Sequence, residues 1–101
     1  MNEENKAIAN TKRQEYMDRK ITHEEYYLWL ADFIGATIAM IPVSLERIRQ
    51  SKDEHLNDIT LATWDQQHPL IRSLAFRKGL AWSYSDTVCV LKNLALQAVK
   101  Q

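Results

Sequence analysis

The longest apolar pattern in the chain predicts a central buried helix over residues 22–41. Within 26–41, only Asp32 and Thr37 are clearly polar. A helix that is apolar on nearly all sides is buried by its neighbours. A membrane span needs about 20 apolar residues, and this run is shorter and contains an acid. We therefore expect a helix in the interior of the protein and no membrane association.

Local signals mark both ends of this predicted helix. Thr22 is a good N-cap, and Glu25, three residues later, completes a capping box. Pro42 is expected to end the helix, because the residue before a proline avoids the helical conformation.

Shorter apolar patterns predict further helices around the central one. In chain order, we expect a peripheral N-terminal segment over 1–20 whose helix begins near residue 3, a short helix that opens at Pro42 or Ser44, the longest loop over 51–58, a short helix over 60–67, a helix from Pro69 to Gly79, and a final helix that begins at Ser83 or Ser85. The N-terminal helix has a thin apolar side, because Asn10 and Thr11 interrupt it. The inward-facing residues of the later helices are expected to be Leu61, Trp64, Leu70, Ile71, Leu74, Val88, Leu91, Leu94, Ala95 and Ala98.

Composition supports one all-α domain. The chain has 101 residues, of which 46% are apolar, and this suffices for a single core. It contains two glycines and two prolines, fewer than the tight turns of an all-β fold require. The prediction is a single domain over 1–101, a compact bundle of four to five helices.

Small residues and aromatic residues suggest two candidate interfaces. Ala31, Gly35 and Ala39 recur at a spacing of four and would share one helical face. That face could pack against another helix of the chain, or it could form a homodimer interface. Trp82 and Tyr84 are the aromatic residues that we expect at a protein interface, since a small domain cannot bury every tryptophan.

Asp32 stands out as an acid within the apolar helix. An unpaired buried charge is costly. Asp32 is therefore expected to face solvent or to pair with Arg72 or Arg77, and a functional carboxylate is the remaining interpretation.

Charge is balanced overall but uneven along the chain. The chain has 13 basic and 13 acidic residues, so net charge gives no support to nucleic-acid binding. The segment 53–65 is acidic, whereas the C-terminal third is basic. A nucleic-acid-binding protein is therefore an alternative, with a basic patch formed by Arg72, Arg77, Lys78 and Lys92.

Catalytic and metal-binding patterns are scarce. The three histidines show no pairing at helical spacing that would form a metal site, and two glycines cannot build a phosphate-binding loop. Arg49 and His55 are separated by five residues, and this spacing is similar to the R-x4-6-H motif of HEPN ribonucleases. An acid–base pair at these residues is the enzyme alternative. We otherwise expect no catalytic residues, no metal and no cofactor.

Three segments resemble a set of small uncharacterised bacteriophage proteins: ITHEEYY at 21–27, HLNDITLATWD at 55–65 and SDTVCVLK at 85–92. The resemblance implies a phage or prophage origin and an accessory role in the host. The single cysteine and the polar start MNEENK indicate a cytoplasmic protein. We therefore expect a non-enzymatic protein that binds a host or phage protein, either as a monomer or as a homodimer.

Overall fold

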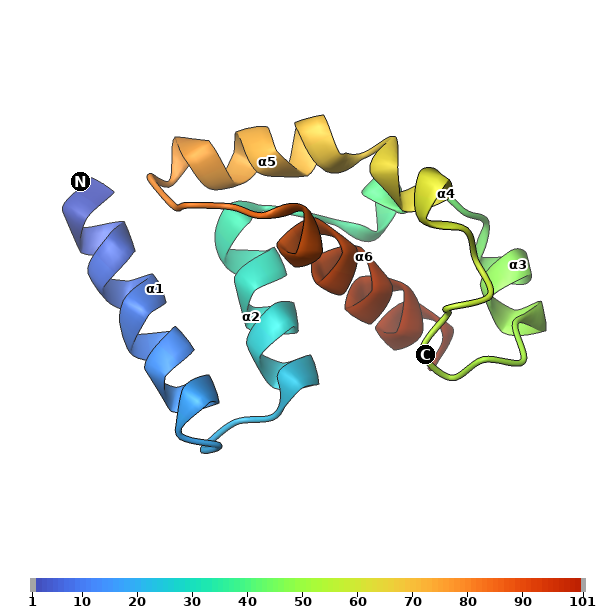
Figure 1. Ribbon diagram of the computed structural model, residues 1–101, viewed down its shortest axis with the longest axis horizontal. Coiled ribbons are helices and arrows are strands. Elements are labelled where there is room, and N and C mark those ends of the chain that lie inside the picture. Colours follow the sequence, from blue (N-terminus) through green and yellow to red (C-terminus); the bar gives the residue numbers. More distant parts are fainter. Residues whose placement is uncertain (1, 101) are drawn as a thin grey trace.

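Six α-helices and one short 3-10 helix form the ordered elements of the computed structural model, which describes residues 2–100 (Figure 1). In chain order they are α1 (Asn2–Met17), α2 (His23–Ile34), η1 (Ile38–Met40), α3 (Leu45–Gln50), α4 (Leu61–Asp65), α5 (His68–Arg77) and α6 (Tyr84–Val99). The prediction of an all-α bundle is confirmed, although the described residues form six α-helices and not four or five. Residues 1 and 101 of the predicted domain lie outside the described residues.

Helix α6 is the element around which the others pack. It contacts α2, α3, α4, α5 and η1, and it lies among them in Figure 1. Val90, Leu91 and Ala95 are fully buried on it. Ser83 caps its first turn and forms a capping box with Asp86, which satisfies backbone N–H groups that a helix start leaves unpaired. The centre of the bundle is therefore α6, and α2 is one of the helices that cover it.

Helix α2 begins as predicted but ends earlier. Thr22 forms the expected capping box with Glu25. The helix stops at Ile34, because Gly35 adopts a left-handed conformation with φ of +84° and donates its N–H to the last carbonyls. Glycine enters this conformation at little cost and commonly ends helices. The prediction that the helix continues to residue 41 is wrong.

The early end of α2 also removes the predicted face of small residues. Ala31 is buried within α2, Gly35 lies just beyond it, and Ala39 belongs to η1. Gly35 and Ala39 are exposed. These three residues share no helical face, so the predicted helical seam for packing or dimerisation has no geometric basis. Asp32 is exposed on α2, which agrees with the solvent-facing interpretation.

Helices α4 and α5 bury fewer residues than the apolar pattern predicts. Trp64 and Ile71 are fully buried as expected, and Ala75 is fully buried too. Leu61 is 59% exposed and Leu70 is 45% exposed, contrary to the prediction. Helix α4 is only five residues long, so it buries one side, and Trp64 occupies that side. Leu70 precedes Ile71 by one position, which turns it about 100° away from the buried face.

Helix α1 lies at the edge of the bundle beside α2 (Figure 1). None of its described residues is buried. The Tyr16 ring stacks on the Tyr26 ring with centroids 4.8 Å apart, and this contact fixes the C-terminal end of α1. No helix within residues 2–100 is long and apolar enough to cross a membrane.

The N-terminal end of α1 rests on the turn at Gly79, and this contact can be tested by substitution. Gly79 has a φ of +76°, and a Cβ atom there would lie 2.8 Å from the Asn2 side chain. Gly79→Ala should therefore lower the free energy of unfolding by about 1–2 kcal/mol from left-handed strain and by about 1 kcal/mol more from the clash. Urea unfolding measures both terms together.

Gly35→Ala is the matched control, because Gly35 is also left-handed but has nothing within 4 Å of the added Cβ. Equal losses for the two variants would show that α1 does not rest on the Gly79 turn.

Candidate functional site

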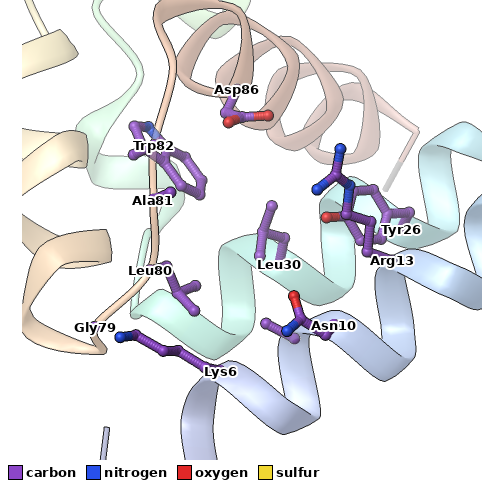
Figure 2. Close-up of a pocket in the computed structure, with 11 residues that line it drawn as sticks. Lys6, Asn10, Arg13, Tyr26, Leu30, Gly79, Leu80, Ala81, Trp82 and Asp86 are labelled. Carbon is purple, nitrogen blue, oxygen red and sulfur yellow. The ribbon is translucent and has the colours of Figure 1, made fainter. Parts of the chain in front are cut away.

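A pocket of about 240 Å³ lies between α1 and the connection that joins α5 to α6 (Figure 2). Helix α1 lines it with Lys6, Ala9, Asn10 and Arg13. These residues recur at spacings of three and four, so they share one face of the helix. The remaining lining residues come from α2, the connection and the first turn of α6: Tyr26, Leu30, Gly79, Leu80, Ala81, Trp82 and Asp86.

The pocket exists because α1 places small and polar residues over an apolar floor. Leu30 and Leu80 are buried beneath it, whereas Ala9 and Asn10 on α1 are too small or too polar to fill the space above. The thin apolar side of this helix was visible in the sequence. The sequence did not show which residues this helix faces, because the opposite wall of the pocket lies about 70 positions further along the chain.

The charged groups of this pocket differ in how they are satisfied. The Asp86 carboxylate accepts hydrogen bonds from the Ser83 backbone N–H and hydroxyl, both at 3.0 Å, and from the Tyr27 hydroxyl at 3.3 Å. Lys6 and Arg13 form no ion pair within the described residues 2–100. The pocket therefore contains two cations available to a ligand and one carboxylate that is already engaged.

A buried hydroxyl orients the tryptophan at the pocket wall. The Trp82 Nε1–H donates to Thr87 Oγ1 at 2.8 Å, and the same oxygen lies 2.7 Å from His68 Nδ1. Thr87 is fully buried on α6. This network joins the start of α5, the connection and α6, and it holds the indole against the pocket.

The two aromatic residues predicted at an interface are bonded within the chain. Trp82 and Tyr84 are both half-buried. The Tyr84 hydroxyl donates to the Leu61 carbonyl at 3.3 Å, and its ring meets the His68 ring edge-on at 5.4 Å. Their large side chains therefore serve packing in this structure, and Trp82 also lines the pocket.

A second surface feature is a shallow groove on the outer side of α5. It is lined by Pro69, Arg72, Ser73, Phe76 and Arg77. Phe76 is 48% exposed, and the Arg72 guanidinium lies over its ring, with Cζ 4.8 Å from the centroid. We call these five residues, together with the exposed Leu70, the α5 outer face.

The structure brings together two of the four residues of the predicted basic patch, Arg72 and Arg77, which line the same groove. Arg72, Arg77 and Lys78 belong to α5 and its C-cap, and the Lys78 ammonium lies 5.6 Å from the Phe33 ring centroid. Lys92 is on α6, where its Nζ donates to Asn57 Oδ1 at 2.9 Å. The basic surface is therefore smaller than the sequence suggested.

The predicted acid–base pair does not share a pocket in the structure. His55 lines two adjoining depressions that also contain His23 and Asn93, whereas Arg49 is exposed on α3 and lines neither. The shared depression of His23 and His55 could not be predicted from the sequence, because the two residues are distant in the chain. Residues 2–100 contain no group of three metal-ligating side chains.

Cys89 lines one of these depressions beside both histidines. Burial raises the pKa of its thiol. The thiol form is therefore favoured at neutral pH, and this form is a poor nucleophile.

Comparisons of the chain with protein-family models, with curated proteins and with solved structures found no match. The resemblance to bacteriophage proteins thus stays a prediction.

The hydrogen bonds at Thr87 give a testable stability effect. Thr87→Val keeps the shape but leaves the Trp82 and His68 nitrogens without their partner, so the free energy of unfolding should fall by about 1–3 kcal/mol. Thr87→Ser keeps the hydroxyl and should cost less. Urea unfolding of the two variants measures the difference, and equal losses would mean that the hydroxyl contributes nothing.

The tyrosines beside Asp86 predict a loss of stability at alkaline pH. Burial raises the pKa of Tyr26 and Tyr27 above the ordinary value of 10.0. The unfolded chain then loses these protons first, so the free energy of unfolding should fall as pH rises from about 9 to 11. Tyr27→Phe removes one such group, and urea unfolding across this range should show a shallower fall. An unchanged pH dependence would contradict this assignment.

Proposed function

We propose that this protein is a non-enzymatic binding module that holds an acidic segment of a partner protein on the α5 outer face. The observation that supports this most is the exposure of Leu70 and Phe76, at 45% and 48%, on a helix whose charged residues are all basic. The partner is a host or phage protein in the context that the sequence resemblance suggests.

The apolar part of this face supports a protein partner. Exposed apolar side chains beside a groove gain free energy when a partner covers them. Phe76 lies in the groove between Arg72 and Arg77, and aromatic and arginine side chains are enriched among the residues that dominate binding energy. The small Ser73 and the rigid Pro69 leave room for a side chain of the partner.

The charge of this face supports an acidic partner. Helix α5 contains Arg72 and Arg77 and no Asp or Glu, and Lys78 follows at its C-cap. Arginines can form paired hydrogen bonds with carboxylates. Opposite charge also speeds association, in a manner that salt weakens.

Two further features favour binding over catalysis. The pKa of the Cys89 thiol is raised, which disfavours a nucleophilic role. Arg49 does not line the depressions that contain His55, so the ribonuclease-like arrangement lacks its basic residue there.

Nucleic-acid binding through Arg72, Arg77 and Lys78 is the second candidate. It would use the same surface, and Phe76 could stack on an unpaired base, but the balanced charge of the chain favours a protein partner. Direct, salt-dependent binding of RNA or DNA by the purified protein would favour this second candidate.

Photo-crosslinking can identify the partner and test the face together. A benzophenone amino acid at Ser73, in the centre of the groove, should crosslink a protein with an acidic segment in host cells, whereas the same probe at the exposed Leu61 should not. With the purified partner, Phe76→Ala should weaken binding at least tenfold, as expected for a central aromatic residue. Arg72→Glu with Arg77→Glu should abolish it.

Leu61→Ala is the apolar control, since Leu61 is exposed on α4 outside the groove. Lys20→Glu with Lys52→Glu reproduces the charge change at exposed residues elsewhere. Equal binding by the α5 variants and these controls would refute the assignment of the face, and binding to RNA or DNA alone would favour the second candidate.

A further inference from the structure

The geometry of the pocket between α1 and the α5–α6 connection points to a binding site for a small aromatic anion. This site is separate from the α5 outer face and does not depend on the function proposed for it. Three features of the pocket support the inference: its volume, its apolar walls and its two cations.

The volume suits a single aromatic ring with a charged substituent. The pocket measures about 240 Å³. An engineered apolar cavity of about 150 Å³ is large enough to bind benzene, so this pocket has room for a ring and a carboxylate. It is smaller than the sites of about 300–1,000 Å³ that hold larger ligands.

The walls of the pocket suit a flat apolar group. Figure 2 shows Trp82 and Leu30 on opposite sides of the space, with Leu80 nearby. Hydrogen bonding to Thr87 fixes the indole, so the aromatic surface is in place before a ligand arrives. Preorganised aromatic walls reduce the entropy lost on binding.

The cations determine the charge of the ligand. Lys6 and Arg13 are seven positions apart on α1, which corresponds to about 10 Å along the helix. In Figure 2 the Lys6 ammonium lies near Gly79, and the Arg13 guanidinium lies near Tyr26. A ring in the middle of the pocket can therefore direct an anionic group to either end. The Asp86 carboxylate keeps its negative charge, but three hydrogen bonds hold it at the first turn of α6, and the two cations outnumber it among the lining residues.

Ligand binding should also strengthen the attachment of α1. None of the described residues of α1 is buried, and the pocket separates one of its faces from the body of the protein. A ring in this space would contact Ala9 on α1 together with Leu30 and Trp82. Because such a ligand binds only the docked arrangement, it stabilises the folded protein by mass action.

Benzoate is the probe for this site, with benzamide as its neutral analogue. Titration of the full ¹⁵N-labelled chain with benzoate should give saturable shifts at the Trp82 indole N–H and at the Leu80 and Ala81 amides. The dissociation constant should be on the order of 1 mM, as expected for a fragment, and benzamide should bind at least tenfold more weakly. Trp82→Phe assigns the indole signal by its disappearance.

The double variant Lys6→Gln with Arg13→Gln should lose at least tenfold in benzoate affinity, and benzoate should no longer raise its Tm. Both residues are exposed, so their replacement leaves the core intact. Lys20→Gln with Lys52→Gln removes the same charge from exposed positions outside the pocket and should bind benzoate as the wild type does. Absence of saturable shifts, equal binding of benzamide, or unchanged affinity in the Lys6 and Arg13 variant would each overturn the inference.

Discussion

Burial of one face of α6 by five other elements is the constraint on which the rest of the structure depends. Its fully buried residues, Val90, Leu91 and Ala95, provide the surface against which the other helices pack. Removal of apolar surface from water is the dominant favourable term in folding. Thr87, which is also fully buried there, is tolerated because its hydroxyl is bonded to Trp82 and His68. The same helix that forms the core therefore also positions the tryptophan of the pocket.

Local chemistry made much of the fold predictable from the sequence. The caps at Thr22, Ser44 and Ser83 and the stop near Gly79 all follow from short-range hydrogen bonding and backbone preference. The error at α2 came from a competition between two such signals. The continuous apolar run to residue 41 favoured one long helix, whereas the left-handed preference of Gly35 ended it. Apolar residues beyond that point pack from η1 and the following loop, so apolar composition alone did not establish helical continuity.

The candidate sites were less predictable, because they join residues that are far apart in the chain. The sequence indicated that α1 has a thin apolar side and that the C-terminal third is basic. It could not show that Arg13 and Trp82 line the same pocket, or that Lys92 binds Asn57 and leaves the basic patch. These juxtapositions depend on how helices cross in three dimensions. Sequence periodicity identifies which face of a helix is apolar, but not which neighbour that face meets.

The features that contribute least to stability are the ones that most suggest function. Leu70 and Phe76 would stabilise the fold more if they were buried, and α1 would attach more firmly with larger apolar residues at Ala9 and Asn10. A sequence selected for stability alone would be expected to have polar residues in place of the exposed Leu70 and Phe76. It would have larger apolar residues in place of Ala9 and Asn10. Natural proteins commonly depart from such local consistency at functional sites. Here the departures fall on two separate surfaces, an exposed apolar and basic helix face and a partly filled pocket beneath a peripheral helix. Neither surface includes the fully buried residues Val90, Leu91 and Ala95 of α6, so the binding proposed at each surface would leave this part of the core in place.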